Sequence, residues 1–142
     1  MGNKFSSMNK MNFEDVQSAI KHPDTYLLIN TLSEYEQGCL IKNTIPASKE
    51  EEIINRYIKA NKECRFVIYG KNTNDEHLYK KYVQLQGLGF TNIYVYLGGL
   101  FEWLLLQDIY GQDEFPTTAK ELDILKYKPQ AILFNSFANS FA

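Results

Sequence analysis

Six polar or small residues between a predicted strand and a predicted helix are the best-placed candidates for chemistry in this 142-residue chain. They follow the apolar run 66–69 and precede a helix that ends near Leu85, and a second apolar run at 93–96 completes a parallel crossover unit. Ligands of such units bind where the first strand's carboxyl end meets the helix N-terminus. We therefore expect a ligand-binding loop, made of Gly70, Lys71, Asn72, Thr73, Asn74 and Asp75.

The loop offers backbone donors and polar side chains but no activated nucleophile. Glycine has none, and the Thr73 hydroxyl is not ionised near neutral pH without an adjacent base. A phosphatase site is not expected either, because no arginine is present to clamp phosphate and the carboxylates of Asp75 and Glu76 would repel an oxyanion. We expect a protein or a small anion as the partner of residues 70–75.

The two cysteines, Cys39 and Cys64, lie in or beside apolar runs and form no Cys-x-x-Cys pair or Cys/His metal spacing. The pattern predicts buried free thiols in a reducing compartment, with no metal and no cofactor. Cys64 precedes the strand at 66–69, so it should lie about 15–20 Å from the loop. An alternative is that one of these thiols acts as a displaced nucleophile.

Residues 1–12 contain no acid and little that could form a core, so they are predicted to be a mobile leader. They also fit the pattern Met-Gly-x-x-x-Ser for N-myristoylation, with Gly2 as the acceptor and Ser6 in place. One acyl chain binds membranes only weakly, and Lys4 and Lys10 would each add about 1 kcal/mol near an anionic leaflet. The sequence leaves open an exchangeable membrane tether and a plain disordered leader.

The charged residues are balanced and dispersed, with 15 basic and 17 acidic side chains and a formal charge of −2. No basic stripe suggests nucleic acid, so none is expected as a partner. No run of about 18 apolar residues could span a bilayer, and no apolar signal region begins the chain. These features predict a cytoplasmic protein with, at most, peripheral contact with a membrane.

Four further segments are predicted before and around the loop. Asn12 should cap a helix over residues 13–20, and the run 26–29 should be a strand buried on both faces. A second short strand is expected at 39–41, and a helix should begin at Lys49.

The C-terminal third begins with a helix at 99–107 that is apolar on all sides and must be buried by its own domain or by a partner. Residues 118–121 form a capping-box pattern that predicts a last helix ending near Leu125. Residues 107–142 are expected to be an extension that packs on the domain or trails from it. A structural or assembly role, using the 100–106 helix and the tail residues Phe134, Phe137 and Phe141, is a further alternative.

Residues 13–106 resemble the rhodanese-like (sulfurtransferase) homology domain. The motifs that carry the resemblance are Leu28-Ile29-Asn30, Glu34-Tyr35, Gly38-Cys39-Leu40-Ile41, Gly89-Phe90-Thr91-Asn92-Ile93 and Gly98-Gly99-Leu100-Phe101-Glu102-Trp103. The last of these meets the family's Gly-Gly-x-x-x-Trp pattern in full. The resemblance implies an α/β fold with a central parallel sheet of about five strands in the order 1-5-4-2-3 and helices on both faces.

The chain departs from the family pattern at the residues that carry chemistry. Asn30 stands where the family has an acid, and Cys39 where it has a histidine. Active members hold a persulfide on a loop cysteine, whose position falls on Gly70 when counted from the strand, and near Asn72 or Thr73 when counted back from 98–99. Residues 70–76 contain no cysteine. We therefore expect a non-catalytic binding or regulatory module, with a sulfurtransferase using Cys39 or Cys64 as the alternative.

Overall fold

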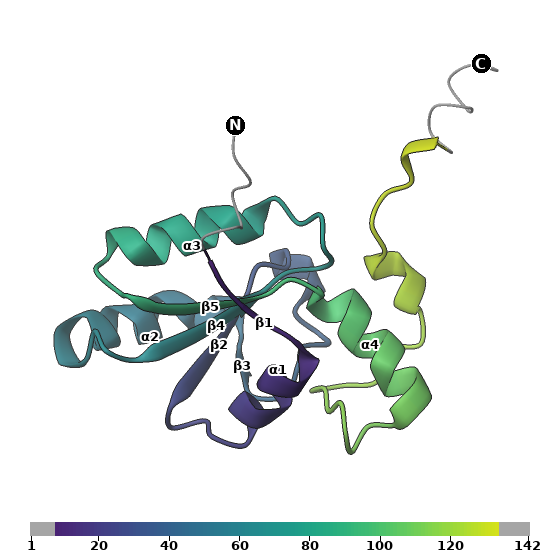
Figure 1. Ribbon diagram of the computed structural model, residues 1–142, viewed down its shortest axis with the longest axis horizontal. Helices are drawn as coiled ribbons and strands as arrows, with labels where there is room; N and C mark the ends of the chain where they lie inside the picture. The colour runs from purple at the N-terminus through teal and green to yellow at the C-terminus, as the bar shows by residue number, and fades with distance from the viewer. Residues whose placement is uncertain (1–7, 134–142) are drawn as a thin grey trace.

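Five short segments pair into one parallel sheet in the computed structural model, which describes residues 8–133 (Figure 1). The strands run in the spatial order β1-β5-β4-β2-β3. Their bounds are Asn9–Met11 (β1), Tyr26–Asn30 (β2), Thr44–Ile45 (β3), Arg65–Tyr69 (β4) and Asn92–Tyr96 (β5). The predicted α/β class and strand order are confirmed.

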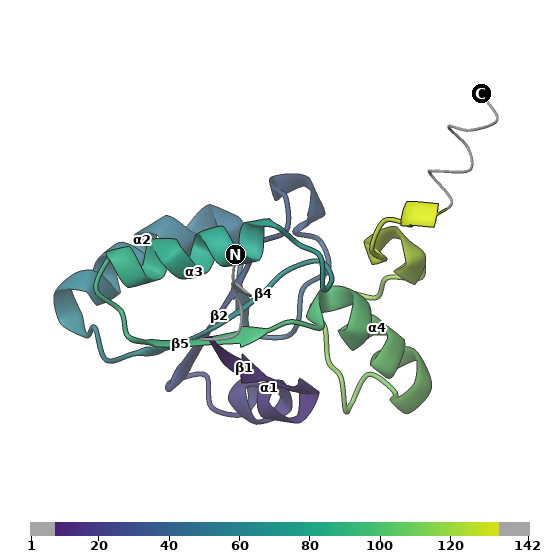
Figure 2. The ribbon, with the colours of Figure 1, turned by 45° about the horizontal axis from the view of Figure 1, so that its top comes forward.

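Helices cover both faces of this sheet (Figures 1 and 2). The α-helices are α1 (Phe13–Ile20), α2 (Ala47–Ala60), α3 (His77–Gly87) and α4 (Gly99–Tyr110), and two short 3-10 helices are η1 (Glu34–Glu36) and η2 (Ile124–Tyr127). Buried residues of α2 and α3 pack on one face, and those of α1, α4 and η2 on the other. The sheet is therefore buried between two helical layers, as expected for parallel strands.

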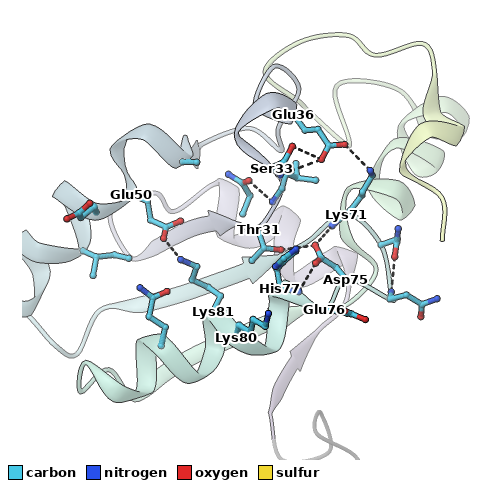
Figure 3. Close-up of a pocket in the computed structure, with 18 of the residues that line it drawn as sticks. Thr31, Ser33, Glu36, Glu50, Lys71, Asp75, Glu76, His77, Lys80 and Lys81 are labelled. Carbon is cyan, nitrogen blue, oxygen red and sulfur yellow. Dashed lines mark hydrogen bonds and ion pairs between the residues drawn. The ribbon is translucent and has the colours of Figure 1, made fainter. Parts of the chain in front are cut away.

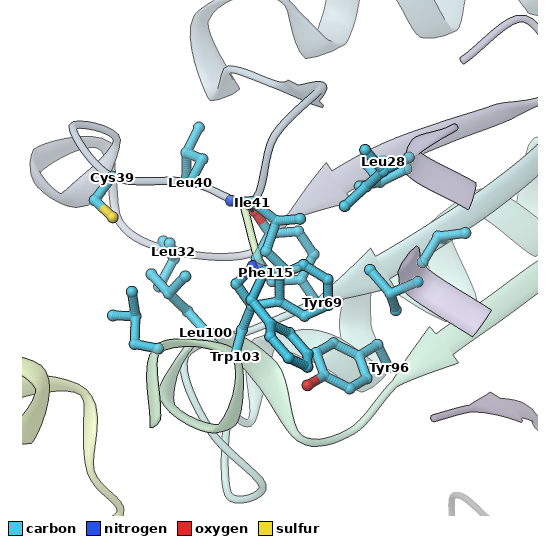
Figure 4. Packing of buried hydrophobic residues seen from close by; sticks show 14 of the residues in the cluster. Leu28, Leu32, Cys39, Leu40, Ile41, Tyr69, Tyr96, Leu100, Trp103 and Phe115 are labelled. Carbon is cyan, nitrogen blue, oxygen red and sulfur yellow. Dashed lines mark hydrogen bonds between the residues drawn. The ribbon is translucent and has the colours of Figure 1, made fainter. Parts of the chain in front are cut away.

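The central strand β4 shows how alternation builds both layers. Phe66 and Ile68 face the α2–α3 layer, whereas Val67 and Tyr69 face the α1–α4 layer, and none of the four has measurable solvent exposure. Figure 4 shows Tyr69 packed in the second layer, close to Ile41. Its hydroxyl accepts a hydrogen bond from the Ile41 backbone N–H at 3.1 Å, so this polar group is satisfied inside the core.

The leader predicted for residues 1–12 is wrong at its end. Asn9–Met11 form the edge strand β1, which pairs in parallel with residues 94–96 of β5, and the side chain of Met8 is buried. These backbone groups gain sheet partners, which the polar composition of the segment did not reveal. Gly2 and residues 1–7 lie outside the described part of the chain.

The strand predicted at 39–41 is also wrong. This segment is irregular and makes one isolated antiparallel bridge, between Ile41 and Thr117, while Thr44–Ile45 forms the edge strand β3 beside β2. The Ile41 N–H is taken by the Tyr69 hydroxyl, so it is unavailable to a neighbouring strand.

The helix predicted to begin at Thr118 does not form. The Thr118 hydroxyl accepts a hydrogen bond from the Leu40 N–H at 3.0 Å, and the Thr118 N–H donates to the Leu40 carbonyl at 2.8 Å. Both capping groups are thus engaged by a distant loop, and a single 3-10 turn, η2, appears later instead. Phe115 and Tyr127 are buried in the core, so the extension packs on the domain at least as far as η2.

Candidate functional site

The structure places the predicted loop at the carboxyl end of β4, next to the end of β2 and ahead of α3 (Figure 3). Gly70 and Asn72 are buried, and Thr73 and Asn74 are exposed. The predicted loop residues are therefore brought together at one edge of the sheet, but only some of their side chains face solvent.

The Asp75 carboxylate fills the interior of this loop. Its Oδ2 atom accepts hydrogen bonds from the Thr31 hydroxyl and the Lys71 N–H, both at 2.9 Å, and its Oδ1 atom accepts one from the His77 N–H at 2.9 Å. One of these donors is the backbone N–H of His77, the first residue of α3, and helix N-termini stabilise anions. The Lys71 N–H belongs to the loop itself. The Asp75 carboxylate therefore occupies the place in the loop that a bound anion would take.

The same carboxylate leaves no room for a side chain on Gly70. A β-carbon at this position would overlap the Asp75 carboxylate and lie 2.7 Å from its Cγ atom and 2.8 Å from its Cβ atom. Any larger residue at position 70, a cysteine included, would require Asp75 to move.

Gly99 fixes the loop from the other side. The N–H groups of Leu100 and Phe101 donate to the carbonyls of Gly70 and Lys71, both at 3.0 Å. Gly99 has φ = +69°, and a β-carbon there would lie 2.7 Å from the Gly70 carbonyl oxygen. The second glycine of the Gly-Gly-x-x-x-Trp pattern is needed because α4 begins in direct backbone contact with the loop.

Asn72 ties the loop to the C-terminal extension. Its side-chain amide donates to the Tyr127 carbonyl at 2.8 Å, and its side-chain oxygen accepts from the Asn74 N–H at 2.8 Å. Both contacts hold the loop in one shape, so the Asn72 amide is engaged within the protein.

A groove of about 1400 Å³ runs from this loop between α2 and α3. Two ion pairs line it: Lys71 Nζ lies 2.9 Å from Glu36 Oε2, and Lys81 of α3 contacts Glu50 of α2. Burial alone would raise the pKa of Glu36, but hydrogen bonds from Lys71 and Ser33 and the charge of Lys71 lower it overall. Glu51, Glu76, Lys80 and Lys128 also line the groove, so charges of both signs border it.

Thr31 and Glu36 are site residues that the sequence did not indicate. Both come from the segment after β2, about 40 residues before the loop, and only the pairing of β2 with β4 brings them to it. Asn30, also unassigned, is buried and exchanges hydrogen bonds with the Gln37 side chain at 2.8 and 3.0 Å. An amide can both donate and accept there, which a carboxylate cannot.

The two cysteines are free and buried, as predicted. The Cys39 thiol donates a hydrogen bond to the Ala119 carbonyl at 3.3 Å, and burial is the main cause that raises its pKa. Cys64 directly precedes β4, at the end opposite the loop, and burial raises its pKa as well. Neither thiol has the electropositive surroundings that favour a thiolate.

Residues 8–133 hold neither a cluster of metal-ligating side chains nor a membrane-spanning helix. No group of three or more His, Cys, Asp or Glu side chains is placed to hold a metal ion in this range. Nor does the same range contain a helix with the length and apolar character needed to cross a membrane.

Comparison with known proteins yields one family and several similar folds. The family model for the rhodanese-like domain matches residues 13–106. The rhodanese-like domain of the Alr3790 protein from Anabaena sp. superposes with a TM-score of 0.54 at 18% identity, over 87% of this chain and 86% of that one. The BH2092 protein from Bacillus halodurans gives 0.55 at 20% identity, over 72% and 74%.

An uncharacterized protein from Saccharomyces cerevisiae gives a TM-score of 0.52 at 17% identity, over 70% of this chain and 93% of that one. A search of curated protein sequences finds no significant match. At these identities the structural similarities indicate a common fold.

Proposed function

The chain belongs to the rhodanese-like domain family, and from this membership we propose that it acts as a non-catalytic binding or regulatory module. The proposal separates the family's scaffold, which the chain keeps, from the family's sulfur chemistry, which its loop is not equipped to perform.

The observation that carries the proposal is the placement of Asp75. A sulfurtransferase loop must present a thiolate and then a persulfide to backbone donors. In this loop a carboxylate bonded to Thr31, Lys71 and His77 already uses such donors. A carboxylate cannot accept sulfane sulfur as a thiolate does, and it repels the anionic donor thiosulfate.

The properties of the cysteines support the same proposal. Cys39 and Cys64 are buried thiols whose pKa values are raised, so little thiolate is present near neutral pH. Cys64 also lies at the opposite end of β4 from the loop, about 15–20 Å away.

We assign the binding surface to the 70–75 loop and the groove beside it, with a protein segment as its partner. A small anion is disfavoured because Asp75 occupies the Lys71 and His77 N–H groups and Glu36 pairs with the Lys71 side chain. The groove is long and open, and the neighbouring Tyr35 side chain is 90% exposed. Exposed aromatic side chains are frequent anchors in protein interfaces.

The proposal includes a reversible membrane tether at Gly2, on the cytoplasmic face. Because the leader precedes β1, and β1 runs parallel to β4 and β5, the leader joins the sheet on the side of the strands' amino ends. The 70–75 loop lies at their carboxyl ends. An acylated leader would therefore leave the loop accessible to a partner in the cytoplasm.

The test is a turnover assay on purified full-length protein with thiosulfate as donor and cyanide as acceptor. The expected rate equals that of the protein-free blank. The variants Cys39→Ser and Cys64→Ser serve as controls. Activity above the blank that either substitution abolishes would overturn the proposal and assign a displaced nucleophile.

A second measurement tests the tether. Intact mass of the protein made in a host that supplies N-myristoyltransferase should show an acyl adduct in wild type and none in Gly2→Ala. An unmodified wild-type protein would reject the tether and leave the binding role unaffected.

A further inference from the structure

Helix α4 presents apolar side chains to solvent opposite its buried face. The side chains of Leu100, Trp103 and Leu104 are buried, as expected for a helix that is apolar on all sides and packs one of them against its own domain. On the outer side Ile109 is 70% exposed and Leu105 is 39% exposed. Tyr110 is 63% exposed but lies on the face of Trp103 at the helix end, with its ring centroid 6.1 Å from that of Phe115. The domain alone therefore does not bury this helix.

Two leucines of the C-terminal extension enlarge this area. Leu122 is 82% exposed and Leu125 is 62% exposed. Leu122 lines a hollow of about 530 Å³ together with Leu104, Gln107 and Asp108 of α4, which are the helix neighbours of Leu105 and Ile109. η2, which contains Leu125, lies beside α4 in both views of the fold (Figures 1 and 2). We name the four residues Leu105, Ile109, Leu122 and Leu125 the α4 surface. Their exposed area is on the order of several hundred Å², the size at which apolar patches mark interaction sites.

The C-terminal segment has the matching chemistry. Residues 129–142 contain no charged side chain, and Leu133, Phe137 and Phe141 recur at the four-residue spacing of one helical face. Asn135, Ser136, Asn139 and Ser140 fall between them. An uncharged apolar segment can cover an apolar surface without leaving a buried charge unpaired.

The described start of this segment points to another copy of the chain. Ile132 and Leu133 are 81% and 74% exposed. In Figures 1 and 2 the ribbon at these residues leads away from α4, and Ile132 borders the groove beside the 70–75 loop. Nine residues follow Leu133, enough for about 13 Å of helix or 30 Å of extended chain.

We propose that residues 131–142 of one copy dock on the α4 surface of a second copy, so that two chains exchange their C-terminal segments. Two-fold symmetry forms the contact twice, which brings the buried area toward the roughly 800 Å² per partner of a stable interface. The proposal does not depend on the proposed loop function, although Ile132 also borders the groove beside the 70–75 loop.

Light scattering coupled to size-exclusion chromatography of the full chain tests the proposal. Across about 5–100 μM, wild type should approach twice the 16.5 kDa monomer mass. Ile109→Glu and Leu133→Glu, both at exposed positions, should each weaken dimerisation at least tenfold. The matched control is Val83→Glu, because Val83 is a 45% exposed apolar residue on α3, and it should dimerise as wild type does.

A mixture of Ile109→Glu and Leu133→Glu distinguishes exchange of the C-terminal segments from other modes of dimerisation. The Leu133→Glu chain retains an intact α4 surface and the Ile109→Glu chain an intact tail, so the mixture should form a heterodimer through one contact.

Three results would overturn the proposal. A monomeric wild type across the range would mean that the tail docks on its own chain or not at all. A dimeric Leu133→Glu variant would indicate pairing of α4 with α4. Dissociation by Val83→Glu would indicate unspecific apolar association.

Discussion

Replacement of Asp75 by alanine tests whether its carboxylate acts as the anion of the loop. The substitution removes three hydrogen bonds, from Thr31, Lys71 and His77. Hydrogen bonds to charged groups contribute about 1.5–3 kcal/mol each, but they are not additive, and Asp75 is partly exposed. We therefore expect the free energy of unfolding to fall by about 2–4 kcal/mol, measured by urea denaturation.

The same variant should acquire an anion site, because the Lys71 and His77 N–H groups lose their acceptor. Added sulfate should then stabilise Asp75→Ala by about 1.4 kcal/mol at ten times its dissociation constant. The matched control is Asp15→Ala, which removes a carboxylate of equal charge from the capping box of α1, far from the loop in sequence. It should lose stability, since a cap contributes about 1 kcal/mol, without gaining a sulfate response beyond that of wild type.

Two results would refute this reasoning. If Asp75→Ala unfolds at the wild-type urea concentration, the three hydrogen bonds do not hold the loop. If sulfate stabilises wild type, Asp15→Ala and Asp75→Ala equally, the loop of the wild-type protein does not already contain its anion.

Three further predictions concern packing and thiol chemistry. Gly99→Ala should lower the free energy of unfolding by about 2–4 kcal/mol, because the added methyl group meets the loop backbone at a residue with left-handed φ. In the control Gly98→Ala the methyl group meets only a flexible side chain, so the free energy of unfolding should change by about 0.5 kcal/mol or less. Tyr69→Phe should cost about 1–3 kcal/mol in thermal or urea unfolding, since a buried N–H loses its acceptor; equal stability would contradict the hydrogen-bond assignment. Iodoacetamide should label Cys39 and Cys64 more slowly in folded than in urea-unfolded protein, and fast labelling of the folded chain at pH 7 would contradict their burial. Because folding raises the pKa values of both thiols, the free energy of unfolding should fall as the pH rises above about 8.5.

The sequence was sufficient for the sheet because its central strands are continuous apolar runs. β2, β4 and β5 each lie within one or two residues of the predicted limits. The two edge strands were not predicted, for a physical reason. β1 is polar and β3 has two residues, so neither carries an apolar pattern. Both form because neighbouring strands supply their backbone hydrogen-bond partners. The helix predicted to begin at Thr118 is absent for a similar reason, since the Leu40 backbone forms hydrogen bonds with the Thr118 groups that would have capped it.

The candidate site was predictable in position but not in its internal chemistry. The strand–loop–helix order was enough to place residues 70–75 at the carboxyl end of the central strand β4. The inward orientation of Asp75 could not be predicted, because it depends on Gly70 lacking a side chain and on the position of Thr31 after β2. Asp75, predicted to face an approaching oxyanion, instead takes the donors that such an anion would need.

Intact-mass spectrometry of the full-length protein before and after incubation with thiosulfate tests the central claim most directly. A protein whose loop holds the Asp75 carboxylate, and whose thiols are buried and protonated, should show no gain of a sulfur atom. A persulfide-sized gain that disappears in Cys39→Ser or Cys64→Ser would contradict the account and identify the chain as a sulfurtransferase with a displaced nucleophile.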